Sequence, residues 1–138
     1  MEYRIITALS GADFIRLRQL YIEAGWISPD DPALFLHPAV AGSCAAVGAF
    51  DENNHLTGFA RALSDGCSDA YIQDVVVAPE CRGQGIGRKL IDTIAAELRR
   101  RGVDWIGLVG EPGTEPFYRK QGFQAKPGYT LWMIPEEQ

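Results

Sequence analysis

Three alternate glycines follow a run of valines near the middle of this sequence and open an amphipathic segment. They are Gly83, Gly85 and Gly87, and Arg82 stands directly before them. Glycine omits the side chain where backbone must approach a ligand closely, and the free N–H groups of a first helical turn favour an anion. Arg82 and Arg88 add positive charge on both sides. The pattern predicts a loop that binds a phosphate or a pyrophosphate.

Spacing separates this loop from two known phosphate-binding loops. A P-loop requires Gly-Lys-Ser/Thr at a fixed distance from its first glycine, but Arg88 and Leu90 stand five residues after Gly83 and Gly85. A dinucleotide-binding loop requires its third glycine where Arg88 stands, and it normally follows the first strand of its domain. Both alternatives are disfavoured, as is the idea that the glycines only let a strand and a helix pack together.

Hydrophobic periodicity predicts the elements that position the loop. Apolar residues recur at helical spacing through the segment after the glycines, including Leu90, Ile94 and Leu98. Helices are expected at Asp13–Ala24, in a short stretch before Pro38, at Gly85–Arg101 and at Glu115–Gln121. Strands are expected at Tyr3–Thr7, Ser43–Phe50, Leu56–Leu63, Ala70–Ala78, Trp105–Val109, Phe123 and Tyr129–Ile134.

This order of elements predicts one α/β (α+β) domain over residues 1–138, in line with the length of the chain. The early strands can pair antiparallel through short connections. The strand Ala70–Val77, the long helix after it and the strand Trp105–Val109 form a βαβ crossover, so these two strands are expected to be parallel. The result is a mixed, mostly antiparallel central sheet with helices on both faces.

Composition narrows the class of protein. Hydrophobic residues make up 46% and charged residues 22%, which argues against disorder. A net charge of −5 does not favour nucleic acid, and no apolar run approaches the roughly 18 residues of a membrane span. No secretion signal is recognised. Cys44, Cys67 and Cys81 form no CxxC pair, and His37 and His55 fit no zinc spacing, so we expect free thiols, no metal and a cytoplasmic location.

The loop Arg82-Gly83-Gln84-Gly85-Ile86-Gly87 resembles the Arg/Gln-x-x-Gly-x-Gly/Ala signature of the GNAT superfamily of acyl-CoA-dependent N-acyltransferases. Two further segments carry the resemblance. Asp74–Pro79 looks like the family's fourth strand, and Phe117–Phe123 looks like its Phe-Tyr-x-x-x-Gly-Phe motif. The stretch Gly58–Asp65 is similar to small single-domain members, including plastid-type arylalkylamine (serotonin) N-acetyltransferases and bacterial relatives.

The resemblance implies acetyl-CoA as co-substrate. Its pantetheine arm would pair with the backbone of the fourth strand as an added peptide strand does, and a bulge in that strand would aim one N–H at the thioester carbonyl. The pyrophosphate would lie on the glycine loop. The binding residues expected are Val75, Val76, Val77, Arg82, Gly83, Gln84, Gly85, Ile86, Gly87, Arg88 and Phe117.

The resemblance also implies direct attack of a neutral amine on the thioester, with Tyr118 as the general acid. The alternative is that Tyr118 only packs in a short helix. Tyr71 and Gln73 stand where many relatives place a Glu or His base, and neither is a base. Asp74, Asp65 and Glu111 are therefore candidates for holding the ammonium or taking its proton through water, against the alternative of ordinary surface carboxylates.

The acceptor site is expected to include Trp26, Tyr71 and Gln73, with a small-molecule amine as the substrate. Trp26 could instead be a core residue. Two other functions stay open: acetylation of a protein lysine or N-terminus, and a non-catalytic acyl-CoA-binding module. The aromatic residues Tyr129 and Trp132 near the C-terminus also allow a homodimer.

Overall fold

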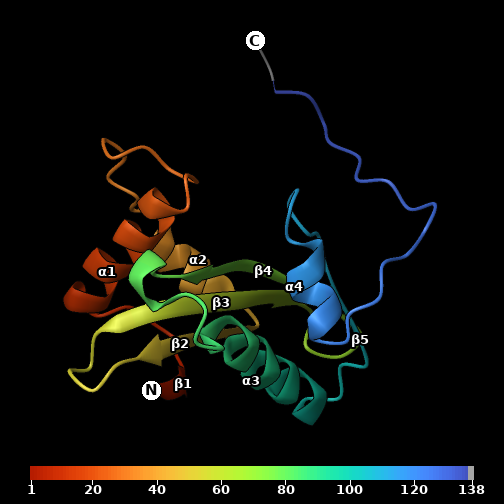
Figure 1. Cartoon of the computed structure of the whole chain (residues 1–138), viewed down its shortest axis with the longest axis horizontal. Coiled ribbons are helices and arrows are strands. Elements are labelled where there is room, and N and C mark those ends of the chain that lie inside the picture. The colour runs from red at the N-terminus through yellow and green to blue at the C-terminus, as the bar shows by residue number, and fades with distance from the viewer. Residues whose placement is uncertain (137–138) are drawn as a thin grey trace. The chain divides into compact units, whose positions relative to one another are not determined.

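The computed structural model describes residues 1–136, in two compact units, residues 1–108 and residues 109 onward (Figure 1). None of the helices in this described part is long and apolar enough to cross a bilayer. The elements of the first unit are β1 (Glu2–Ile5), α1 (Gly11–Glu23), α2 (Leu36–Gly42), β2 (Ala45–Phe50), β3 (Leu56–Ser64), β4 (Asp69–Val77), the 3-10 turn η1 (Pro79–Cys81), α3 (Ile86–Arg100) and β5 (Trp105–Leu108). The second unit holds α4 (Glu115–Lys120).

The five strands form one sheet in the order β1-β2-β3-β4-β5. All neighbouring pairs are antiparallel except β4 and β5, which run parallel on either side of the α3 crossover. The predicted mixed, mostly antiparallel sheet with a βαβ crossover is therefore confirmed.

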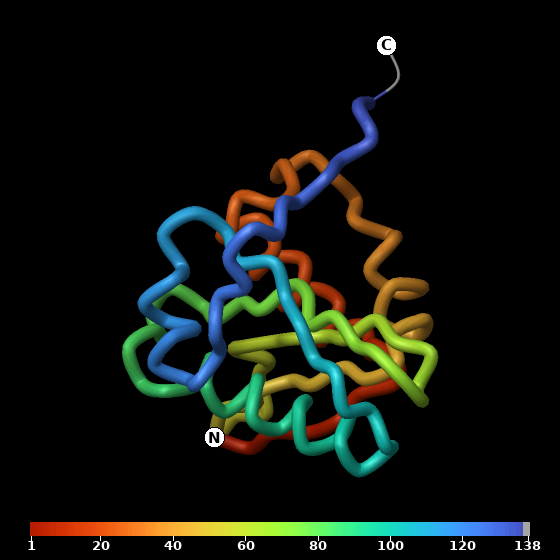
Figure 2. Tube along the Cα trace, turned by 90° about the vertical axis from the view of Figure 1, so that its right-hand side faces the viewer, coloured from red at the N-terminus to blue at the C-terminus, as the bar shows by residue number. Residues whose placement is uncertain are grey.

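Helices cover both faces of this sheet, with α1 and α2 on one face and α3 on the other (Figures 1 and 2). The predicted apolar face of α3 is buried, including Leu90, Ile94 and Leu98. A Cβ on Gly58 of β3 would lie 3.0 Å from Leu90 and 3.1 Å from Ile86. Glycine at this position therefore lets α3 pack directly on the sheet. Every residue of β2 is buried, as expected for a strand covered on both faces.

The two helices on the other face begin for different reasons. Ser10 caps α1, because its hydroxyl accepts the Asp13 N–H at 3.1 Å. The prediction of a second helix before Pro38 is wrong, because α2 runs from Leu36 to Gly42 and contains that proline. Proline is tolerated there because the first-turn N–H groups of a helix have no intrahelical acceptor.

The predicted strands at Phe123 and Tyr129–Ile134 are also wrong, since the described residues after α4 form no strand. Tyr129, Trp132 and Ile134 are 84%, 87% and 93% exposed. Apolar and aromatic composition favours a strand, but a strand exists only where neighbouring backbone supplies its hydrogen bonds. Residues 129–134 are accordingly not assigned to any strand of the described chain.

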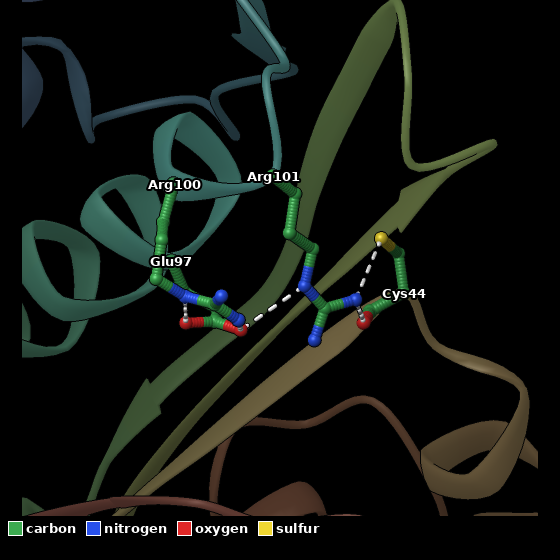
Figure 3. A network of polar contacts seen from close by, with 4 residues as sticks. All are labelled: Cys44, Glu97, Arg100 and Arg101. Atoms are coloured by element: carbon green, nitrogen blue, oxygen red, sulfur yellow. Dashed lines mark hydrogen bonds and ion pairs between the residues drawn. The ribbon is translucent and has the colours of Figure 1, made fainter.

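An ion-pair network fixes the C-terminal end of α3 to the start of β2 (Figure 3). Glu97 lies 2.7 Å from the Arg100 guanidinium and 3.0 Å from that of Arg101. Arg101 in turn donates to the Cys44 carbonyl at 2.5 Å. Hydrogen bonds from Arg100, and then from Arg101, lower the pKa of Glu97 from 4.5 to about 2. The basic residues also suit the negative end of the helix dipole.

We expect Glu97→Gln to lower the free energy of unfolding by about 1 kcal/mol or less, because exposed ion pairs contribute little. Since folding lowers the pKa of Glu97, its stabilisation is complete above about pH 4.5 and disappears as the pH falls through about 2. Urea unfolding across this pH range measures the difference. Asp92→Asn is the control, because its ion pair with Arg88 is 3.9 Å long and more exposed. A difference from wild type that stays constant down to pH 2 would contradict this prediction.

Candidate functional site

The glycine loop joins η1 to α3 and has the backbone that only glycine adopts readily. Gly83 has φ +78° and Gly85 has φ +81°. Nothing lies within 4 Å of a Cβ built at either position. The backbone conformation, rather than crowding, therefore accounts for these two glycines, and the space beside them is open.

The N-terminal end of α3 faces this loop without a side-chain cap. Gly85 is the N-cap residue, and the first turn holds no acidic side chain. The N–H groups of Ile86, Gly87 and Arg88 precede the first intrahelical bond, which Lys89 donates to Gly85 at 3.1 Å. Together with the helix dipole they form a donor set that fits the diphosphate of an acyl-CoA.

Beyond its fourth residue, β4 has a strand partner on one side only. It pairs with β5 from Asp69 to Ile72, whereas the described chain places no strand beside Gln73–Val77 on that side. Backbone N–H and C=O groups along such an edge can pair with an extended ligand. The Val77 carbonyl is engaged already, since it accepts Nε of Arg82 at 3.2 Å.

The expected bulge in β4 is confirmed and lies at Asp74. Arg61 of β3 pairs with Gln73, and Phe59 pairs with Val76, so three steps on β4 oppose two on β3. Asp74 has φ +56°, a left-handed conformation inside a strand. Because cross-strand partners share a face, the extra residue places both Gln73 and Val76 on the face that carries Arg61 and Phe59.

The Asp74 carboxylate is held by two partners from other elements. Its Oδ2 accepts the Tyr21 hydroxyl of α1 at 2.7 Å and Nε of Arg61 at 2.8 Å. Burial, followed by the hydrogen bond to Asp74, raises the pKa of Tyr21, so its hydroxyl stays protonated. Neither Tyr21 nor Arg61 was predicted to contact Asp74, because nothing in their local sequence indicates a partner so distant along the chain.

The predicted acceptor residues lie in different surroundings. Trp26 packs edge-on against Tyr21, with ring centroids 5.0 Å apart, at the border of the core on the α1 side. Tyr71 is 47% exposed and packs edge-on against Trp105 of β5 at 5.3 Å. Gln73 is exposed on β4. Trp105, the aromatic neighbour of Tyr71, was not predicted as a site residue.

Other predicted side chains have structural contacts of their own. The side chain of Val76 is buried in the core beneath α1 and α2, so only its backbone could face a ligand. Asp65 accepts the N–H groups of Cys67 and Ser68, each at 2.9 Å, and these bonds lower its pKa. Its carboxylate thus closes a turn. Within residues 1–136 no cluster of His, Cys, Asp and Glu could hold a metal ion.

In the second unit, Tyr118 is half-buried in α4. Its ring packs edge-on against Phe117 at 5.0 Å and against Phe123 at 5.7 Å. Burial, and then the negative charge of Glu111, raise the pKa of Tyr118 above its ordinary value of 10.0. The phenol therefore stays protonated throughout the neutral range. Phe117 is itself 39% exposed.

The sequence of this chain is similar to those of known proteins. Residues 43–125 match the acetyltransferase (GNAT) domain family. The chain is 35% identical over 114 residues to the uncharacterized N-acetyltransferase ycf52 of Pyropia yezoensis, covering 80% of this chain and 64% of that protein. It is 46% identical over 69 residues to serotonin N-acetyltransferase 2, chloroplastic, of Oryza sativa subsp. japonica, covering 50% of this chain and 34% of that protein.

A crystal structure of a putative GNAT-family acetyltransferase from Xanthomonas campestris pv. campestris is similar over the whole fold. The TM-score is 0.72 at 25% identity, and the match covers 98% of this chain and 95% of the other. The chain spans less than two thirds of the two curated relatives named above. Since the family match runs from β2 through the glycine loop to α4, the chain belongs to the GNAT family of acetyltransferases.

Proposed function

We propose that this protein is an acyl-CoA-dependent N-acetyltransferase that transfers the acetyl group of acetyl-CoA to a primary amine of a small molecule. The observation that carries the proposal is the glycine loop, where Gly83 and Gly85 leave open space before an uncapped helix N-terminus. Such a donor set binds a diphosphate without any special side chain. The single-sided β4 next to it suits an extended, amide-containing arm.

The proposed reaction is direct attack within a ternary complex. The nitrogen of the neutral amine bonds to the acyl carbon, the carbon–sulfur bond breaks, and the sulfur takes a proton. A backbone N–H at Val75, beside the bulge, would stabilise charge on the carbonyl oxygen, an effect worth about 3 kcal/mol per donor. The nitrogen loses a proton to solvent or through water, because Tyr71 and Gln73, at the positions where many relatives carry a base, cannot accept it.

Tyr118 is proposed as the acid that supplies the proton to sulfur. Its place in the Phe-Tyr-x-x-x-Gly-Phe motif supports this role, as does the raised pKa, which keeps the phenol protonated at neutral pH. Phe117 and Phe123 hold the ring edge-on from two sides. A proton donor fixed in this way needs little reorganisation during the reaction.

An aromatic primary amine is the acceptor we favour. The rice relative is named for serotonin, an aromatic amine. In this chain Tyr71 and Trp105 form an edge-to-face pair, and both rings are close to half-exposed. Exposed rings of this kind can pack against an aromatic ligand or attract its ammonium group.

We expect Gly85→Ala to weaken acetyl-CoA binding roughly tenfold. The left-handed φ of +81° costs an L-residue about 1–2 kcal/mol, and the loop can relieve this strain only by leaving the binding geometry. Gly102→Ala is the matched control, because Gly102 has φ +92° and equally open surroundings but follows the opposite end of α3. Calorimetric titration measures both affinities. Equal losses of affinity in the two variants would contradict a diphosphate site at the loop.

We expect Tyr118→Phe to lower kcat about 100-fold while the Kd for acetyl-CoA stays unchanged. Because the pKa of Tyr118 is raised above 10.0, its acid form persists to high pH, and loss of that form should lower kcat only above pH 10. Stopped-flow thiol release measures kcat against pH. Tyr129→Phe, at an exposed position of the same unit, is the control. An unchanged kcat in Tyr118→Phe would remove the acid role.

A panel of amines tests the proposed function as a whole. We expect acetyl-CoA consumption to depend on an added primary amine, with aromatic ethylamines faster than aliphatic amines of similar size. Thiol release and product mass measure turnover. Faster reaction with lysine-containing or N-terminal peptides would favour protein acetylation. Acetyl-CoA binding with no amine-dependent turnover would identify a non-catalytic acyl-CoA-binding module.

A further inference from the structure

Asp74 has a backbone conformation that needs support. Three non-glycine residues of the described chain have positive φ, namely Ala33, Asn54 and Asp74, and only Asp74 lies inside a strand. Aspartate tolerates this conformation better than most residues, but the conformation still carries strain. Strain of this kind persists where surrounding contacts determine the geometry.

Those contacts come from two other elements. Tyr21 reaches Asp74 from α1 and Arg61 reaches it from β3, and both bonds end on the same carboxylate oxygen. Tyr21 is only 4% exposed, and the side chains of Arg61 and Asp74 are 16% and 27% exposed. Little water competes for these bonds, so each is stronger than a surface contact. We call Tyr21, Arg61 and Asp74 the bulge clamp.

The two donors of the clamp, Tyr21 and Arg61, are each held by further contacts. The Tyr21 ring packs against Trp26, Phe35 and Phe59, with centroid distances of 5.0, 6.2 and 6.4 Å. Arg61 lies in the β3 ladder directly opposite Gln73, the residue before the bulge. The position of the Asp74 carboxylate is therefore fixed by the packing of α1 and by the register of β3.

A partly buried ion pair does not by itself imply a role in the reaction, so the place of this pair in the sheet matters. Asp74 and Val75 are the residues that the β3–β4 register skips. Their amides leave the regular ladder at the point where β4 also lacks a strand neighbour on its other side. A small rotation of the Asp74 backbone would therefore change the direction of the next N–H.

We propose that Tyr21 and Arg61 are positioning residues that hold the Asp74 carboxylate and thereby fix the direction of the Val75 N–H toward the acyl carbonyl. This inference rests on the proposed acetyl transfer. It gives Asp74 an anchoring role in place of the role of base. Neither Tyr21 nor Arg61 needs to touch the substrate.

The test uses the full chain and compares substitutions at three positions. We expect Tyr21→Phe and Arg61→Met each to lower kcat about tenfold or more, since an oxyanion donor contributes 10²- to 10³-fold and is here misdirected rather than lost. The Kd for acetyl-CoA should stay within about twofold, because the glycine loop is unchanged. Tyr3→Phe and Arg99→Met are the controls, since they alter a tyrosine of β1 and an exposed arginine of α3 outside the clamp.

Two substitutions of Asp74 separate the anchoring role from other roles. Asn tolerates the left-handed backbone conformation, and its amide oxygen can accept the hydrogen bonds of both Tyr21 and Arg61. Asp74→Asn should therefore keep most of the activity. If Asp74 were a catalytic base, the same substitution would abolish the activity. Gly permits the conformation but lacks the anchor, so Asp74→Gly should behave like Tyr21→Phe. An inactive Asp74→Asn that is folded and binds acetyl-CoA, or a fully active Asp74→Gly, would overturn the clamp.

The ¹⁵N–¹H resonance of the Val75 amide gives a readout that does not depend on turnover. We expect it to shift when acetyl-CoA is added to wild type, and to move in free Tyr21→Phe and Arg61→Met but not in the controls. An active enzyme whose clamp variants keep full kcat and an unmoved Val75 resonance would refute the clamp alone. A wild type with neither turnover nor a Val75 response to acetyl-CoA would refute the proposed function and the clamp with it.

Discussion

One extra residue in β4 determines the geometry of the candidate site. β5 pairs with β4 from Asp69 to Ile72 and β3 pairs with it in regular register from Ala70 to Gln73, whereas the register with β3 shifts beyond Gln73. The insertion at Asp74 changes which side chains face α1. As a result, Val76 packs in the core and the strand beyond the bulge can offer its backbone rather than its side chains. A site built from main-chain groups needs such an insertion, because it turns the following side chains toward the core and leaves the backbone for a ligand.

The position of the glycine loop also depends on β4, because the loop follows the C-terminal end of this strand. β4 ends at Val77, and η1 turns the chain so that α3 begins nine residues later, at Ile86. Packing of Leu90 and Ile86 over Gly58 fixes α3 against the sheet, and its far end is tied to β2 through Arg101. The N-terminal donors of α3 are thus set relative to β4 by core packing, whereas the bulge is set by polar contacts.

Most of the fold could be predicted from local pattern. The glycine loop, the apolar face of α3 and the parallel crossover are encoded in short, strongly periodic segments, and the structure confirms them. The bulge followed only from the family resemblance. The Asp74 contacts with Tyr21 and Arg61 could not be predicted, because they join residues 53 and 13 positions apart and depend on how α1 packs.

The two errors have a common physical origin. The helix around Pro38 begins where tertiary contacts bury Leu36 and Val40, and not where composition alone suggests. Residues 129–134 have strand-like composition but no described partner, so their β propensity is not expressed. In both cases local preference is a weak guide, because packing and pairing decide the outcome.

The glycine loop and the clamp, which are the two halves of the candidate site, bring together residues at different separations along the chain. The loop and its flanking strands lie within residues 69–108, so their contacts close short loops of chain, whereas the clamp must first bring Tyr21 to Asp74 across 53 residues. Loop-closure entropy favours the shorter connections. Forming the clamp therefore costs slightly more chain entropy than forming the glycine loop, and packing of α1 on the sheet must offset that cost.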